Sequence, residues 1–448
     1  MTTIRSSRSE PMQQDPDRLL VRGLGLRQLT AHIFNYTVGS GIFVLPAVAV
    51  AQLGTAAPLA YVVCAVVMAL VVMIFAEAGS RVTVTGGPYA YVEAGLGPFF
   101  GFVTGILLAA AQMSAGGAIA ALVGESVARL LGIESAPASK TITALLMAVL
   151  VYVNVRGLRF GARVVELSTA AKLVPLVFFI VAGAWFIVPQ NLHIAAWPEA
   201  SRVATTSGTL IFAFIGIESA LTPTGEIRDP SRTVPRAAML ALTGATLLYL
   251  AVQTVALGVL GPLLGADTVA PLASATSVFA GDAGATFLLA GATISMLGWV
   301  TGSVLAAPRT IFAFARNGYL PRGLAAVHSQ YHTPHAAIIA YGVLVVAMSW
   351  TGTFQELAVL ANLSALGVFA LTACAVVALR RKNVRAENPP WLMPGGLTVP
   401  AVTCVLIAWI AVQTVSRREF IAFAAVWGIS LAVYVVRRLG GSRGARAG

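Results

Sequence analysis

Long apolar segments separated by short polar ones dominate the chain. No Asp, Glu, Lys or Arg occurs between Arg27 and Glu77, and a single membrane-spanning helix needs about 20 apolar residues. At roughly 35 residues per span with its loop, the 448 residues accommodate about 12 spans. The predicted spans are 28–51, 57–79, 97–124, 140–155, 163–189, 203–222, 237–260, 283–312, 335–351, 355–379, 398–415 and 419–436.

Two of these spans are interrupted near their centres. Residues 39–41 read Gly-Ser-Gly, with Pro46 close behind, and they weaken the helix of the first span. Gly216 and the charged Glu218 interrupt the sixth. An unpaired backbone group in hydrocarbon costs several kcal/mol, so a helix broken at that depth is tolerated only where its freed groups face a cavity or a ligand. The breaks therefore predict a binding site at mid-membrane.

Composition and charge agree with an all-α polytopic membrane protein. The chain is 58% hydrophobic and only 10% charged, whereas soluble proteins carry about 25% charged residues. Most of the 29 Lys and Arg residues fall in segments that share one side of the membrane. By the positive-inside rule this bias places both termini in the cytoplasm and the protein in the cell membrane. The net charge of +12 is then a topological and lipid-facing signal, and no nucleic-acid partner is expected.

The order of the spans predicts two related halves. Five spans per half is an odd number, so the second half is inverted relative to the first, and inverted repeats place the substrate at their interface. The two interrupted spans are the corresponding first members of the halves. The expected segments are a cytoplasmic N-terminal tail at 1–24, a first repeat at 25–189, a second repeat at 203–380, spans 11 and 12 at 398–436, and a cytoplasmic C-terminal tail at 437–448.

Several motifs carry a family resemblance. They are Gly39-Ser40-Gly41-Ile42-Phe43 with Pro46, Gly86-Gly87-Pro88-Tyr89-Ala90-Tyr91 with Gly97-Pro98, Phe212-Ala213-Phe214-Ile215-Gly216-Ile217-Glu218, the loop from Glu226 to Arg236, and Arg316-Asn317-Gly318-Tyr319-Leu320-Pro321. In order and spacing the chain resembles the amino acid–polyamine–organocation (APC) superfamily, and within it bacterial amino acid permeases and arginine/agmatine-type antiporters. The resemblance implies a LeuT-like fold of five plus five helices with two additional C-terminal helices.

The two breaks predict the substrate contacts. A helix N-terminus carries roughly half a positive charge and suits a carboxylate. Ser40 and Gly41, beside Gly39, stand at the restart of the first span and are the candidates for this contact. Freed carbonyls between Phe212 and Ile215, next to Gly216, suit an α-ammonium group. In the family these segments bind the amino acid backbone; for Ser40 alone, helix packing by a small residue is the alternative.

Aromatic residues near the breaks are candidates for the pocket wall. Trp299 matches an aromatic that lines the pocket in the arginine/agmatine-type antiporters, and its alternative is a core tryptophan. Tyr36 and Phe212 flank the two breaks and are expected to cover the substrate from either side.

Lys172 is a charged residue roughly 14 Å inside the fifth span. A lysine at that depth is by default a functional hypothesis, and because burial penalises its charged form it could exchange a proton. In proton-coupled relatives a span-5 lysine replaces the cation that sodium-coupled relatives hold between spans 1, 5 and 8, and Lys172 matches that position. Its ammonium is expected at carbonyls near Val38 and Gly39 and at hydroxyls such as Thr301 or Ser303. A snorkelling or permanently charged lysine is the alternative.

Glu218 is predicted to take part in proton coupling or gating, or to pair with a distant polar group; recognition of a cationic substrate is a third role. No nucleotide-binding loop and no catalytic set occurs in the sequence, so the protein is not expected to be an enzyme or to need a cofactor. His328, His332 and His335 are interrupted by Pro334, and no metal site is expected.

These observations predict a secondary active transporter that takes up a small or neutral amino acid by alternating access, coupled to protons. Its partners are the amino acid, the proton and membrane lipid. The alternatives are an amino acid exchanger or exporter, including antiport of cationic amino acids or polyamines, and a membrane receptor that does not transport.

Overall fold

The computed structural model describes residues 25–82, 87–133, 135–156, 161–194, 196–217, 227–267, 269–316, 320–385 and 389–414, with isolated positions from 417 to 428. From 161 to 171 it describes the backbone alone. Within these ranges the chain is helical and contains no strand.

The helices follow one another along the chain, as the apolar pattern predicts. They are α1 (Leu26–Thr37), α2 (Gly41–Leu53), α3 (Ala57–Arg81), α4 (Pro88–Leu96), α5 (Pro98–Leu130), α6 (Ala136–Val155), α7 (Gly161–Gly183), α8 (Ala200–Leu210), α10 (Pro230–Leu260), α11 (Pro271–Arg316), α12 (His335–Thr351), α13 (Phe354–Arg381) and α14 (Thr398–Thr414). Short 3-10 turns join several of them, including η5 (Ile211–Ala213) and η7 (Gly261–Ala266).

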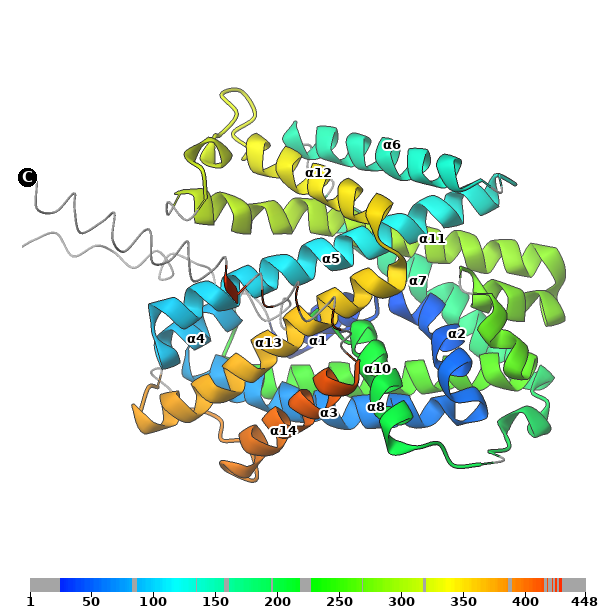
Figure 1. Cartoon of the computed structure of the whole chain (residues 1–448), viewed down its shortest axis with the longest axis horizontal. Helices are drawn as coiled ribbons and strands as arrows, with labels where there is room; N and C mark the ends of the chain where they lie inside the picture. The colour runs from blue at the N-terminus through cyan, green and yellow to red at the C-terminus, as the bar shows by residue number, and fades with distance from the viewer. Residues whose placement is uncertain are drawn as a thin grey trace, which may run out of the picture.

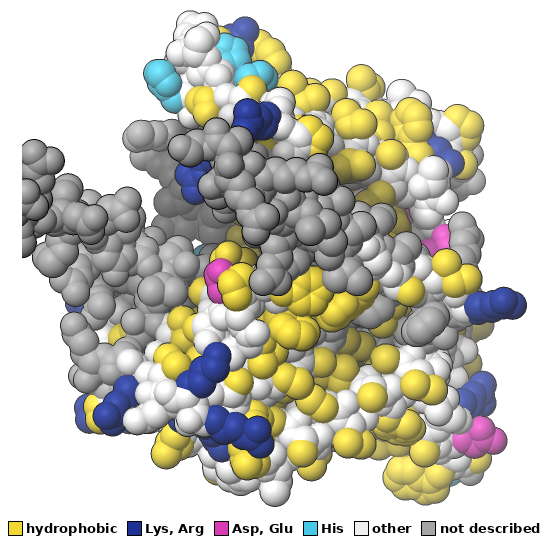
Figure 2. Space-filling view, turned by 60° about the vertical axis from the view of Figure 1, so that its left-hand side comes forward, with side chains coloured by type: hydrophobic (Ala, Val, Ile, Leu, Met, Phe, Trp, Pro, Cys, Tyr) yellow, Lys and Arg dark blue, Asp and Glu magenta, His cyan; other side chains and the backbone are white. Residues whose placement is uncertain are grey.

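Length and composition make this a multi-pass membrane protein. Among the described residues, 6 helical stretches are long and apolar enough to cross a membrane, and shorter apolar helices accompany them. The long helices run side by side across the molecule (Figure 1). Hydrophobic side chains cover much of the described part of the face in Figure 2, while Lys and Arg form small separate groups. Such an outer surface suits lipid.

Most of the predicted spans overlap these helices, with several differences. The short helix α4 was not predicted, α10 begins at Pro230 ahead of the predicted 237, and α8 ends at Leu210 within the span predicted at 203–222. The helix α11 begins at Pro271, well before the predicted span at 283–312. A backbone bend at Gly281, with φ at 61°, separates this first part from the rest, so the predicted span is the part that follows the bend. Most of the span predicted at 419–436 lies outside the described residues.

Most of the interior forms one apolar core to which nearly all the helices contribute. The helix α5 packs against α11 and α13, and α10 packs against α1 and α3. Every residue of α2 from Gly41 to Val50 is buried, as expected of a helix enclosed by other helices. Because α2 lies inside this bundle and Thr37, Val38 and Ser40 are buried, the backbone break between α1 and α2 is largely enclosed.

A buried carboxylate ties three segments together at the end of α3. Glu77 is fully buried, and its Oε1 accepts from Arg81 Nε at 2.9 Å and from Arg380 Nε at 2.7 Å. Its Oε2 accepts from the Met393 backbone N–H at 3.0 Å. The cluster joins α3 to α13 and to the segment before α14. Sequence reasoning missed it, although a Glu four residues before an Arg is a helix pairing signal.

Candidate functional site

The first predicted break is present. The helix α1 ends at Thr37 and α2 begins at Gly41, with Val38 in a non-helical conformation. The Gly39 N–H turns back to the Thr37 carbonyl at 2.8 Å. Ser40 is only 1% exposed, and its hydroxyl has no hydrogen-bond partner among the described residues. An unpaired buried hydroxyl is costly, so this position suits contact with a polar ligand.

The second break starts earlier than Gly216, where the sequence placed it. The helix α8 ends at Leu210, and the 3-10 turn η5 follows. The N–H groups of Phe214 and Ile215 both reach the Ile211 carbonyl, at 2.8 and 3.1 Å. Gly216 has φ at 122°, a conformation that residues with a side chain rarely adopt. Glu218, predicted beside it, lies outside the described residues.

The two breaks lie against each other. A Cβ atom built on Gly41 would lie 3.1 Å from the Ala213 Cα, and one built on Gly216 would lie 2.9 Å from the Tyr36 carbonyl oxygen. At Gly216 the two backbones therefore approach too closely for a side chain, and at Gly41 a side chain would fit only if its neighbours gave way slightly. The structure thus brings the predicted residues 39–41 and 212–216 into one site.

Lys172 reaches this site from α7. Its Nζ donates to the Val38 carbonyl at 2.8 Å and to the Asn35 carbonyl at 3.0 Å, and the residue is 4% exposed. Both acceptors belong to the end of α1, whose last carbonyls have no helical partners. The ammonium therefore bonds backbone carbonyls beside the break, and its described hydrogen bonds go to carbonyl oxygens.

The expected contact between Lys172 and span-8 hydroxyls differs from what the structure shows. The Thr301 hydroxyl donates to the Leu297 carbonyl of its own helix at 2.7 Å. The Ser303 hydroxyl pairs with the Tyr341 hydroxyl. Threonine and serine in membrane helices commonly bond back to their own helix or across to a neighbour, and this register is not readable from sequence.

Two polar side chains that sequence reasoning missed complete the backbone bonding of the breaks. The Tyr249 hydroxyl, on α10, lies 2.8 Å from the Thr37 carbonyl oxygen and 2.6 Å from the Ala213 carbonyl oxygen. The Asn362 amide, on α13, donates to the carbonyls of Gly208 and Thr209 at 2.9 and 3.2 Å. Tyr249 and Asn362 are polar residues within apolar spans, and this feature of the sequence could have pointed to their roles.

Aromatic and apolar side chains surround the breaks. Trp299 lies beside the first break, since a Cβ built on Gly39 would lie 3.7 Å from its indole Cδ1. Phe212 is buried and packs edge-on against Phe354, with ring centroids 5.4 Å apart. Tyr36 and Ile215 are partly buried. The walls next to the breaks are therefore largely apolar.

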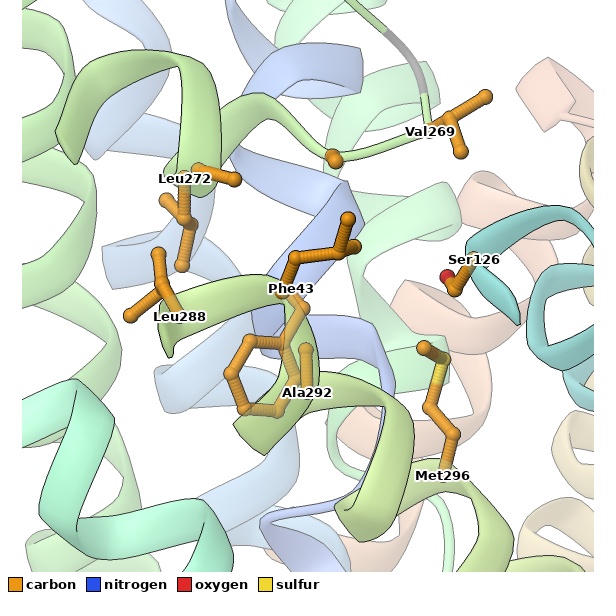
Figure 3. A pocket seen from close by; sticks show the side chains of 10 residues that line it. Phe43, Ser126, Val269, Leu272, Leu288, Ala292 and Met296 are labelled. Atoms are coloured by element: carbon orange, nitrogen blue, oxygen red, sulfur yellow. The ribbon is translucent and has the colours of Figure 1, made fainter. Parts of the chain in front are cut away.

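A small hollow lies next to the start of α2. It is lined by side chains of α2, α5 and α11, among them Phe43, Leu288 and Met296 (Figure 3). Ser126 contributes a hydroxyl that points into the hollow in this view and has no hydrogen-bond partner among the described residues. Apart from that group the lining is apolar.

An ion pair stands one turn further along α5. Arg129 donates both terminal nitrogens to Asp267, at 3.1 and 3.0 Å. The same carboxylate accepts from the N–H groups of Val269 and Ala270 and from the Ser274 hydroxyl. Burial alone would raise the pKa of Asp267, but these hydrogen bonds outweigh it and lower the pKa to about 2. The pair thus ties α5 to the segment that lines the hollow.

These features define a multi-pass helical membrane protein in which two broken helices meet. Comparison with known proteins adds the family. The Amino acid permease family matches residues 24–432, so the chain belongs to the amino acid permease family and is a transporter rather than an enzyme.

Named relatives agree with this assignment. An uncharacterized transporter of Mycobacterium tuberculosis is 31% identical over 95% of this chain and 93% of its own length. The branched-chain amino acid permease BcaP of Bacillus subtilis is 25% identical over 82% of this chain and 83% of its own length. The methylthioribose transporter of the same organism is 24% identical over 90% of this chain and 91% of its own length.

Proposed function

We propose that this protein is a secondary active transporter that takes up a small or neutral amino acid together with protons, by alternating access around the two breaks. The observation that carries the proposal is the Lys172 ammonium seated on the Asn35 and Val38 carbonyls. A charge buried in a membrane span is expensive, and such residues commonly mark ion or proton pathways.

The substrate contacts follow from the polarity of the breaks. The positive end of α2 and the unpaired Ser40 hydroxyl suit the α-carboxylate. Tyr249 occupies the Ala213 carbonyl, so the α-ammonium group is assigned to the remaining freed carbonyls between Phe212 and Ile215. The apolar surroundings of the breaks favour a side chain without charge, as the name of the relative BcaP suggests.

The coupling step follows from the contacts of Lys172. When protonated, its ammonium holds the end of α1 against α7 through two charge-assisted hydrogen bonds. When it loses the proton, the amine keeps fewer donors and no charge, so the hold weakens and α1 is free to move. Protonation would thereby bias the two access states. Glu218 stays the second candidate for proton coupling or gating.

We assign the chain a LeuT-like arrangement of 12 helices. Residues 25–189 and 203–380 are the two inverted repeats, and residues 398–436 hold the additional helices. Both termini face the cytoplasm, and the protein resides in the cell membrane. The facing breaks of α1–α2 and α8 support the pairing of the first members of the repeats.

The test is uptake by the purified full chain in proteoliposomes with an imposed pH gradient. We expect neutral amino acid uptake to follow the gradient in the wild type and in Lys140→Ala, whose lysine is exposed on α6. We expect Lys172→Ala to lose the pH dependence. Should the Lys172→Ala variant follow the gradient as the wild type does, the coupling role of this lysine is refuted.

The same vesicles separate the alternatives. Uptake that requires preloading with amino acid would identify an exchanger, and binding without uptake in any condition would identify a receptor. The substrate panel includes cationic amino acids, polyamines and methylthioribose, because one relative is named for the last of these.

A further inference from the structure

Tyr249 touches both breaks with a single hydroxyl group. Its oxygen lies 2.8 Å from the Thr37 carbonyl oxygen, at the end of α1, and 2.6 Å from the Ala213 carbonyl oxygen, at the end of η5. The two acceptors belong to different helices that are far apart in the sequence. We propose that Tyr249 is a positioning residue that clamps the two broken helices in their substrate-binding arrangement. This inference rests on the proposed function.

The ring of Tyr249 is held rigidly, so the position of its hydroxyl is set by packing. The side chain is fully buried. Its ring meets Phe214 edge-on with centroids 5.0 Å apart, and the Tyr61 ring lies 6.3 Å away. Phe214 itself belongs to the second break. The clamp is therefore anchored in α10, which packs against α1, and in the break that it holds.

The hydroxyl has one proton for two acceptors. The Thr37 carbonyl also accepts from the Gly39 N–H at 2.8 Å, so it keeps a donor when the Tyr249 proton is given to Ala213. With the Tyr249 proton on Ala213, that carbonyl is engaged, and the α-ammonium of a substrate is left with the other freed carbonyls of the second break. Tyr249 thus sets which backbone oxygen of the breaks can bind an amino acid.

A buried tyrosine commonly finds some partner for its hydroxyl, and the neighbouring Tyr61 provides the contrast. Tyr61 is also fully buried, yet its hydroxyl has no hydrogen-bond partner among the described residues. Burial of a tyrosine in this core therefore does not by itself require its hydroxyl to find a hydrogen-bond partner, so the two contacts of Tyr249 need another explanation. Tyr61→Phe is a matched control, since it removes a buried hydroxyl next to Tyr249 without removing a described contact to the breaks.

Hydrogen exchange tests the clamp without any substrate. In Tyr249→Phe we expect the amides of residues 36–41 and 211–217 to exchange about five- to tenfold faster than in the wild type, because the one buried hydroxyl within hydrogen-bond distance of both segments is lost. Amides of α12 serve as the internal reference. In Tyr61→Phe both breaks should exchange as in the wild type. Equal exchange in the two variants, or faster exchange in one break alone, would overturn the clamp.

Uptake then tests its role in substrate binding. We expect Tyr249→Phe to raise the half-saturating amino acid concentration about three- to tenfold, with Tyr61→Phe within about twofold of the wild type. An unchanged half-saturating concentration in Tyr249→Phe would reject the positioning role even if exchange is faster. If the wild type transports no amino acid, the proposed function fails, while the exchange experiment still decides whether the clamp exists.

Discussion

Replacing Gly216 by alanine tests the close approach of the two breaks. Gly216 has φ at 122°, and a conformation of this kind costs a residue with a side chain about 1–3 kcal/mol. The new Cβ would also lie 2.9 Å from the Tyr36 carbonyl oxygen, so that one backbone must move. We expect the free energy of unfolding to fall by about 2–4 kcal/mol in total. If about 2 kcal/mol of this cost falls on the substrate-binding arrangement of the two breaks, the affinity for substrate drops about 30-fold.

The assay compares Gly216→Ala with Gly302→Ala. Gly302 lies within α11, and a Cβ built there would meet no atom within 4 Å. Alanine at that helical position should raise stability by up to about 1 kcal/mol. Denaturation in mixed micelles, followed by tryptophan fluorescence, gives the unfolding free energies, and equilibrium binding gives the affinities. If Gly216→Ala unfolds and binds like Gly302→Ala, then the breaks do not meet at Gly216.

Three further predictions concern side chains that hold the helices together. Asp267→Asn should lower the free energy of unfolding by up to about 2 kcal/mol near neutral pH. This figure allows for solvent screening of the ion pair, because Arg129 is half exposed. Because the pKa of Asp267 is lowered to about 2, its contribution to stability is present above its unfolded pKa of about 4 and is lost as the pH falls towards 2. Unfolding curves of the wild type and Asp267→Asn at several pH values check this dependence. A stability difference between the two proteins that does not change with pH would contradict it. Glu77→Gln should cost about 3–5 kcal/mol by leaving arginine charge uncompensated, whereas Glu199→Gln, at an exposed site, should change little in the same thermal assay. Asn362→Ala should cost about 1–3 kcal/mol and speed amide exchange at the end of α8, and unchanged exchange there would show that its amide does not hold that end.

Much of the helical layout could be predicted from the apolar pattern. The span predicted at 335–351 coincides with α12, and the span at 57–79 falls within α3. This succeeds because a bilayer demands a minimum apolar length and complete backbone hydrogen bonding, and both demands are local. The bend at Gly281 escaped prediction, since one glycine in a membrane helix does not distinguish a bend from close packing.

The site could be predicted only in part. The break at residues 39–41 was readable because two glycines and a serine weaken a helix locally. The onset of the second break at Ile211, ahead of Gly216, was not readable, because Ile211 and Phe212 are ordinary residues of an apolar helix. Its position depends on the partners that take up the freed carbonyls. Those partners lie on other helices.

By itself the sequence determined that this chain crosses the membrane many times, that two spans break, and that a lysine lies well inside an apolar segment. Composition, helix propensity and the cost of burying charge are properties of residues and short segments. Only the tertiary structure decided that the breaks face each other, that Lys172 reaches the end of α1, and that Tyr249 joins Thr37 to Ala213. Hydrogen bonds between distant helices depend on their relative rotation and depth, and these are set by the packing of the whole bundle.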